Sequence, residues 1–130
     1  MKVYIAAPWI ERDWIRVFAQ QFDDRGITIT HRWWDVEGDF ADHPRMQLCA
    51  KCDVQGVRNA DVLVLYDAHK SEGKAVEQGI AIALNKPIVA LGVIGAQSQN
   101  VFHHLDNYIW VDHPDKVWDA LLDCKAFLLS

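Results

Sequence analysis

The sequence has 130 residues, the size of one domain, and its composition of 51% hydrophobic and 24% charged residues excludes a disordered chain. The net charge of -5, with Lys and Arg scattered along the chain, argues against nucleic-acid binding and favours a small-molecule partner. Three cysteines with no leader segment before the first apolar run predict reduced thiols and a cytoplasmic protein. No apolar stretch is long enough to span a membrane.

The first quarter of the chain predicts a strand, a helix and a second strand. Residues 2–8 form a short apolar run that Pro8 ends. Residues 11–25 predict a helix, and Gly26 follows where a helix commonly stops. The apolar stripe of this helix consists of Trp14, Ile15, Phe18, Ala19 and Phe22. The β-branched residues 27–31 predict the second strand.

The middle of the chain predicts a long loop and then a helix, a strand and another helix. Residues 33–44 contain Gly, Asp and Pro, and a loop of this length is more often functional than a mere connection. A helix over residues 46–58 leads into the continuous apolar run 61–66, which predicts a buried strand. The next helix covers residues 71–85.

The last third of the chain repeats this alternation. Residues 87–92 and 108–111 predict strands, with a short segment at 100–105 between them, and residues 114–127 predict the last helix. Because strands alternate with helices throughout, the sequence predicts one α/β domain over residues 1–130, with a parallel sheet that is covered on both faces.

Glu77 is the most informative residue, because its helix otherwise consists of Ala, Ile, Val and Gly. A buried carboxylate needs compensation, and we expect the nearby helix N-terminus to supply it. A glutamate above the carboxyl end of a parallel strand can act as a nucleophile on an anomeric carbon. The alternative is an ordinary surface glutamate, although the apolar neighbours Val76, Ile80 and Ala81 weaken that interpretation.

Asp53 is a second candidate because Asp is a poor helix former and this one lies well inside a predicted helix. A second carboxyl group that donates a proton to a leaving base would complement a nucleophilic Glu77. Asp61, by contrast, fits ordinary turn chemistry before a strand.

Three further features have plain structural interpretations. Cys49 and Cys52 form a CxxC pair without the further ligands that a zinc site needs, so we expect two helix cysteines, one or both of them in the core, and no metal. Of Trp33 and Trp34, we expect one in the core and leave the other open as a wall that could stack on a nucleobase. Ser71 and Gly73 open the Glu77 helix as a candidate anion or hydroxyl site, without the glycine spacing of ATP or NAD sites.

The chain resembles the nucleoside 2-deoxyribosyltransferases and their relatives, the 2'-deoxynucleoside 5'-monophosphate N-glycosidases. The resemblance runs from Tyr4 to about Leu105 and is most specific at residues 73–87, where the glutamate precedes Gly79, Ala81 and Ala83 and the Lys-Pro pair at 86–87. It implies a flavodoxin-like (Rossmann-like) three-layer sandwich with a five-stranded parallel sheet.

The resemblance also implies roles for individual residues. Glu77 would be the nucleophile, Tyr4 would contact it, and Asp53, with Gly56 after it, would recognise the base. The remaining substrate-binding residues would be Ala6, Trp9, Ser71, Gly73, Asn100 and Phe102. Because the family's asparagine reaches into the neighbouring subunit's site, the resemblance implies at least a dimer with shared sites and no cofactor.

One position departs from the transferases. They usually carry an aspartate where this chain has Ser71, whereas the monophosphate glycosidases carry serine. Asn100 and the Pro8-Trp9 pair look more like the nucleoside enzymes. The sequence therefore leaves open whether the substrate carries a 5'-hydroxyl or a 5'-phosphate.

We therefore predict cleavage of the N-glycosidic bond of a 2'-deoxyribonucleoside through a deoxyribosyl-glutamate, with transfer to another base or to water. The alternatives are a 5'-monophosphate N-glycosidase and a non-catalytic nucleotide-sensing domain.

Overall fold

The computed structural model describes residues 1–36, 42–92 and 98–129. Its parallel sheet has five strands in the order β2-β1-β3-β4-β5, which confirms the flavodoxin-like prediction. The strands are β1 (Lys2–Ala6), β2 (Thr28–Ile29), β3 (Val62–Tyr66), β4 (Ile88–Leu91) and β5 (Tyr108–Val111).

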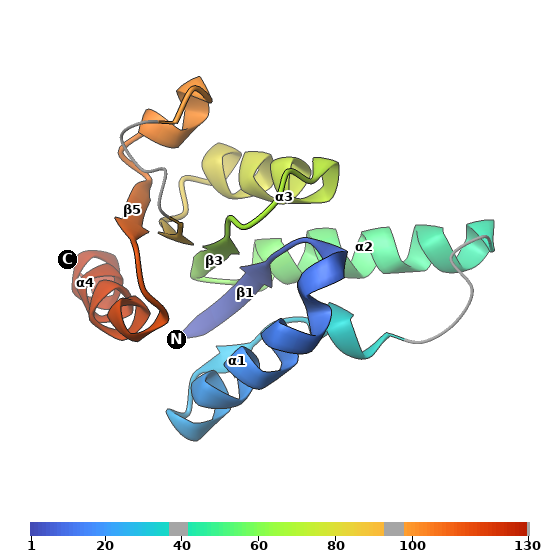
Figure 1. The fold of residues 1–130 in the computed structure, drawn as a ribbon, viewed down its shortest axis with the longest axis horizontal. Helices are drawn as coiled ribbons and strands as arrows, with labels where there is room; N and C mark the ends of the chain where they lie inside the picture. The colour runs from blue at the N-terminus through green and yellow to red at the C-terminus, as the bar shows by residue number, and fades with distance from the viewer. Residues whose placement is uncertain (37–41, 93–97, 130) are drawn as a thin grey trace.

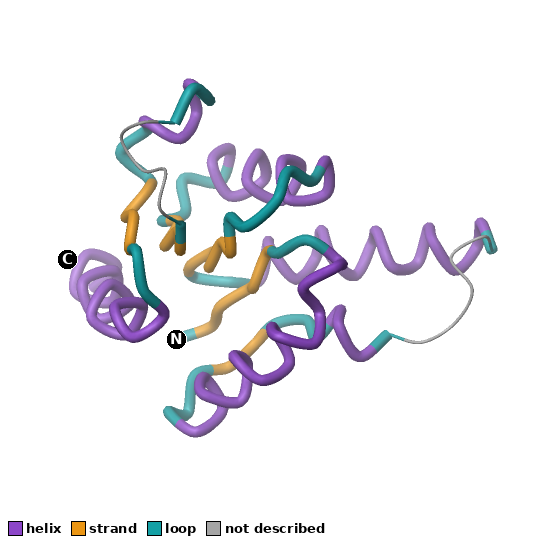
Figure 2. Tube along the Cα trace, viewed as in Figure 1, coloured by secondary structure: helices purple, strands orange, loops and turns teal. Residues whose placement is uncertain are grey.

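Helices cover both faces of the sheet, as Figures 1 and 2 show. The helices α1 (Arg12–Asp24) and α4 (Val117–Leu129) lie on one face, where the rings of Phe22 and Trp118 meet at 4.8 Å. The other face is covered by α2 (His43–Asn59) and α3 (Glu72–Ala83), which pack against each other. Short 3-10 helices precede or follow several strands: η1 (Trp9–Glu11), η2 (Trp33–Asp35), η4 (Val101–His104) and η5 (Pro114–Lys116).

The core lies on both sides of the central strands. The residues Val62 to Leu65 of β3 and all of β4 are buried, as the continuous apolar runs of these segments predict. The predicted stripe of α1 is buried at four positions, Ile15, Phe18, Ala19 and Phe22. Trp14 differs: it is 36% exposed and stacks on Tyr66 at a ring distance of 4.5 Å, so it covers the edge of the core.

Two helix ends show how local sequence sets the boundaries. Gly26 follows α1 with φ at +69°, a conformation that side chains disfavour, so the predicted stop is confirmed. The helix α2 begins at His43, earlier than the predicted residue 46, because Pro44 fits the first turn of a helix, where no N–H is needed. The predicted loop over residues 33–44 contains η2, and its residues 37–41 lie outside the described residues.

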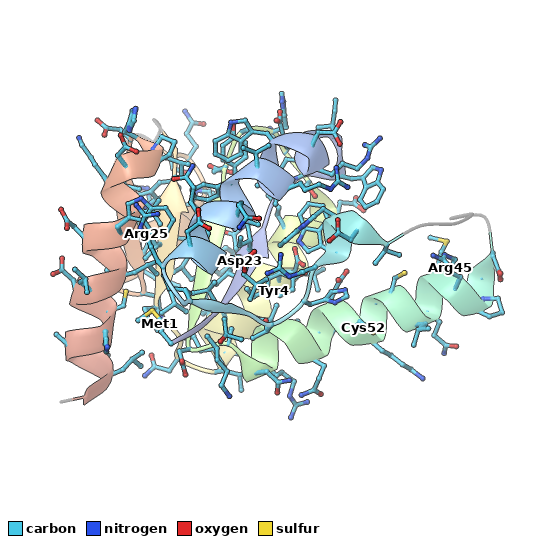
Figure 3. All side chains as sticks on the ribbon, turned by 90° about the horizontal axis from the view of Figure 1, so that it is seen from below. Met1, Tyr4, Asp23, Arg25, Arg45 and Cys52 are labelled. Carbon is cyan, nitrogen blue, oxygen red and sulfur yellow. The ribbon has the colours of Figure 1, made fainter. Side chains whose placement is uncertain are left out.

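The functional edge of the sheet follows from its order. The chain runs outward from β1 to β2 and then returns past β1 to β3, so the connections diverge between β1 and β3. Ligands of open α/β sheets bind at such a point, beyond the carboxyl ends of the strands. In Figure 1 the first turns of α2 extend well beyond the sheet, and Figure 3 places Arg45 on this projecting part and Tyr4 inside the molecule.

Candidate active site

A cavity of about 350 Å³ opens at this edge, and its wall is formed by the carboxyl end of β1, the segments that follow β1 and β2, and the helices α2 and α3. One part of its wall is apolar and comprises Trp9, Trp33, Val36, Val54, Val76 and Ile80. The other part is polar and comprises Tyr4, His31, Asp53, Ser71, Lys74 and Glu77. An apolar pocket with a few convergent polar groups is the usual form of a small-molecule site.

Glu77 lies half-buried in the cavity wall and accepts a hydrogen bond from the hydroxyl of Tyr4 through its Oε2. Burial raises the pKa of Glu77 to about 8, the Tyr4 hydrogen bond opposes this rise, and the negative charge of Asp53 adds to it. At neutral pH Glu77 therefore holds a proton in the unliganded protein.

The compensation for Glu77 comes from Tyr4 and not from the helix N-terminus, so the expectation from the sequence was wrong on this point. Glu77 lies in the second turn of α3, beyond the free N–H groups of the first turn. One of those groups, the N–H of Lys74, already donates to Oγ of Ser71 at 3.3 Å.

Tyr4 connects the two carboxyl groups of the site. It is fully buried on β1, and its pKa is raised above the usual range by burial first and then by the nearby charges of Glu77 and Asp53. The hydroxyl consequently stays protonated around neutral pH and can donate to a carboxylate there.

Asp53 extends from the middle of α2 into the cavity, with its Oδ1 lying 3.3 Å from Nε2 of His31. His31 follows the carboxyl end of β2, which brings a third titratable side chain to the same edge of the sheet. Sequence reasoning did not select His31, although its place at the carboxyl end of the predicted strand 27–31 was the signal that could have found it.

Ser71 and Lys74 form the wall at the start of α3. Ser71 is the N-cap residue, and its Oγ accepts from the Lys74 N–H. Its hydroxyl proton donates to none of the described residues. Lys74 is 2% exposed, and its Nζ pairs with Asp67 Oδ1 at 3.0 Å. Sequence reasoning also missed Lys74, since lysines in the first turn of a helix are usually exposed.

Trp33 and Trp34 are both buried, which confirms the prediction that one of them lies in the core, and Trp33 also lines the cavity. Trp34 is 2% exposed and packs edge-on against Trp33, so it belongs to the core. Trp33 lines the cavity, and its indole N–H donates to the carbonyl of Ile5 at 2.7 Å, which fixes the ring. The ring centres of Trp9 and Trp33 lie 6.0 Å apart, with Trp9 at the more open side of the same wall.

The scan of protein-family models and the search of curated proteins found no match. Solved structures do match. A 2-deoxyribosyltransferase of Bacillus psychrosaccharolyticus aligns at a TM-score of 0.69 and 19% identity over 90% of each chain. The CMP N-glycosidase BcmB of Clostridium botulinum aligns at a TM-score of 0.61 and 17% identity, over 93% of this chain and 98% of that one. A conserved protein of Enterococcus faecalis V583 aligns at a TM-score of 0.66 and 18% identity, over 97% of this chain and 98% of that one.

The chain has the 2-deoxyribosyltransferase fold.

Within this deoxyribosyltransferase fold, six of the nine residues selected from the sequence line one cavity: Tyr4, Trp9, Asp53, Ser71, Gly73 and Glu77. Ala6 is fully buried in β1 and does not line the cavity, where the adjacent Ala7 does. Asn100 and Phe102 belong to the η4 segment, also outside the cavity. Asn100 Oδ1 accepts from the N–H of Phe102 at 3.1 Å, and the Phe102 ring is 60% exposed.

Cys49 and Cys52 are both half-buried and neither belongs to the core, so the prediction that at least one of them lies there was wrong. Cys49 lines the cavity of the deoxyribosyltransferase fold, Cys52 lies one turn further along α2, and neither is disulfide-bonded. Among residues 1–36, 42–92 and 98–129, no three His, Cys, Asp or Glu side chains cluster as metal ligands. In the same described ranges, none of the helices combines the length and the apolar character that crossing a bilayer requires.

Proposed function

We propose that the protein cleaves the N-glycosidic bond of a 2'-deoxyribonucleoside and transfers the deoxyribose to another nucleobase or to water. The observation that carries the proposal is the convergence of Tyr4, Asp53 and Glu77 in one cavity, where the Tyr4 hydroxyl donates a hydrogen bond to Oε2 of Glu77. The fold, shared with a 2-deoxyribosyltransferase and a CMP N-glycosidase, supports the same class of reaction.

In the first step an oxygen of Glu77 forms a bond to C1' while the bond from C1' to the base nitrogen breaks. The electron pair of the broken bond goes to the base, and Asp53 donates a proton to the base or holds it by a hydrogen bond. The product is a deoxyribosyl ester of Glu77, as in retaining glycosidases. A second base or water then attacks C1', gives its proton to Asp53 and releases Glu77.

The proton balance of the site suits this step. The reaction needs Glu77 ionised and the leaving base protonated, whereas the unliganded protein holds a proton on Glu77, whose pKa is raised to about 8 by burial. Moving that proton from Glu77 toward Asp53 ionises the nucleophile and supplies the proton that the leaving base needs. Tyr4, which lies against both carboxyl groups, keeps its own proton and stabilises the Glu77 carboxylate that results.

The sugar and the base would occupy opposite ends of the cavity. The hydroxyl of Ser71 and the backbone at Gly73 are available for the 5' end of the sugar, and the indoles of Trp9 and Trp33 for the face of the base. Asn100 and Phe102 would act in the cavity of a second copy, which makes the protein at least a dimer. We place the protein in the cytoplasm, where its three free cysteines would stay reduced.

The primary test mixes a 2'-deoxynucleoside with a different free base and separates the products by chromatography. Glu77→Ala should abolish exchange, whereas Glu72→Ala, at an exposed position of the same helix, should keep it. Near wild-type exchange by Glu77→Ala would refute the proposal. Binding of a nucleoside without turnover by the wild type would point to the sensing domain instead.

The shared site has its own test. An inactive Glu77→Ala protein mixed with an inactive Asn100→Ala protein should regain activity, because one site of the mixed dimer contains both wild-type residues. If the mixture stays inactive although mass spectrometry shows mixed dimers, Asn100 does not act across the interface.

A 5'-monophosphate N-glycosidase is the second candidate, and the combination of Ser71 and Lys74 in the cavity wall favours it. A hydroxyl and an ammonium group both bind phosphate. Against it, Asp67 already pairs with Lys74, and Glu72 adds negative charge. Parallel incubations with a deoxynucleoside and its monophosphate separate the candidates, since cleavage of the monophosphate alone would establish the second one.

A further inference from the structure

Two buried polar atoms of the cavity wall lie beside each other and have no well-aligned hydrogen-bond partner among the described residues. Nε2 of His31 and Oδ1 of Asp53 are both shielded from solvent, and neither makes a well-aligned hydrogen bond to any described residue. They lie 3.3 Å apart. Burying two polar groups without hydrogen bonds destabilises the fold, so the most stable arrangement places a hydrogen on Nε2 that points toward Oδ1.

The fold fixes His31 at this place through contacts with α2. The hydroxyl of Thr30, the preceding residue, donates to the carbonyl of Gly56 at 2.7 Å. A Cβ atom on Gly56 would lie 2.9 Å from the Cβ of His31, so only glycine allows this close approach. Gly56 lies one turn after Asp53 on the same helix, and the end of β2 is therefore held against the turn that carries the carboxyl group.

We propose that His31 is a positioning residue that acts through Asp53, and this inference rests on the proposed function. Its Nε2–H occupies Oδ1 and holds the carboxyl group in one orientation, so that the other oxygen, Oδ2, faces the leaving base. Oδ2 is then the atom that transfers or shares the proton with the base. Without His31, Oδ1 competes for that proton and the carboxyl group turns away from the base.

This role makes a prediction that depends on the leaving group. A base that leaves without being protonated does not need an oriented Asp53, so the loss of His31 should have little effect on its cleavage. A purely structural role of His31 would instead weaken the cleavage of all substrates alike. Substrates of this kind are N7-methylated purine deoxynucleosides, whose base leaves as a neutral molecule, and 5-nitro-2'-deoxyuridine, whose base leaves as a stabilised anion.

The experiment compares wild type, His31→Leu, His31→Gln and Asp53→Asn on an ordinary substrate and on its activated counterpart, in whichever base class the wild type cleaves. Leucine fills the space of the ring without a donor, whereas the amide nitrogen of glutamine can occupy the place of Nε2. Thermal unfolding of each variant establishes that it is folded.

We expect His31→Leu to lower kcat on the ordinary substrate by about 10- to 100-fold, part of the roughly 10²- to 10⁴-fold that a general acid contributes, with KM little changed. On the activated substrate the loss should stay within about threefold, and Asp53→Asn should follow the same pattern with a larger loss. His31→Gln should recover most of the activity on the ordinary substrate.

Two results would overturn the inference while leaving the proposed function intact: equal losses of His31→Leu on both substrates, or a His31→Gln protein no better than His31→Leu. A wild-type protein that cleaves neither substrate would instead refute the proposed function, and the inference with it.

Discussion

Tyr4 on β1 donates a hydrogen bond to Glu77 on α3, across 73 positions of the sequence. The contact arises because β1 and β3 are neighbours in the sheet, with Tyr4 opposite Leu63, and because α3 follows β3 and covers the same edge. This hydrogen bond opposes the effect of burial on the pKa of Glu77, so the charge state of the site depends on it. The predictions below follow from this relationship and from the packing around it.

The first prediction concerns the pH dependence of kcat/KM. The reaction on an ordinary nucleoside needs one proton in the site, and Glu77, whose pKa is raised to about 8, holds that proton in the free enzyme. We expect kcat/KM to fall about tenfold per pH unit above pH 8, as this proton is lost. A profile that instead rises through pH 8 would show that the proton is not used.

A substrate whose base leaves without a proton provides the control. For it only the ionised form of Glu77 matters, so kcat/KM should rise toward pH 8 and then level off. The two substrates should therefore show opposite slopes around pH 8, which no general effect of pH on folding can produce.

The second prediction concerns stability. The pKa of Glu77 is near 4.5 in the unfolded chain and about 8 in the folded one, so between these values the folded protein holds a proton that the unfolded chain has released. The free energy of unfolding contributed by this group is therefore fully present below pH 4.5 and is lost as the pH rises to 8.

Glu77→Gln removes this dependence while keeping an acceptor for the Tyr4 hydroxyl. Relative to wild type, its free energy of unfolding should increase by about 3–5 kcal/mol between pH 5 and pH 9. Urea denaturation at both pH values measures the change. An unchanged difference between the two proteins would mean that Glu77 is not buried in solution.

The third prediction concerns Tyr4→Phe, which keeps the buried ring and removes the hydroxyl. The Tyr4 hydrogen bond lowers the pKa of Glu77, so its loss should raise that pKa and move the upper limb of the pH profile to more alkaline values. Because a preorganised donor to the carboxylate is lost, kcat/KM should also fall by about 100-fold. Full activity with an unmoved limb would contradict the role of Tyr4.

The fourth prediction concerns Gly56, which lies against two residues of the site. A Cβ atom on Gly56 would lie 2.8 Å from Cδ2 of Tyr4 and 2.9 Å from Cβ of His31. Gly56→Ala should therefore push both side chains from their places and lower activity at least tenfold, at a stability cost of about 1–3 kcal/mol.

Gly79→Ala is the matched control, because a Cβ atom there would meet nothing within 4 Å and the position is an exposed one inside α3. It should stabilise the protein by about 0.5–1 kcal/mol and leave activity unchanged. Equal behaviour of the two variants would show that the contacts of Gly56 do not matter.

The elements could be predicted from the sequence because each has a local cause. The continuous apolar runs of β3 and β4 permit only buried strands, and the stripe from Ile15 to Phe22 permits one orientation of α1. Gly26 marks the end of a helix through its own backbone preference. Asp53 and Glu77 could be selected because each is an acidic residue in a place that penalises it.

The remaining features depend on which segments become neighbours, which the local sequence does not encode. The sequence assigned the compensation of Glu77 to its own helix, whereas the partner is Tyr4, a residue of the adjacent strand. Lys74 carried no local signal, because an exposed and a buried lysine look the same in sequence. His31 stood at the end of a predicted strand, but only the fold shows that this end faces Asp53. The raised pKa of Glu77 likewise exists only in the folded protein, where the surrounding segments bury the side chain and α2 brings the charge of Asp53 near it. Burial and charge are properties of the assembled edge and not of any one segment.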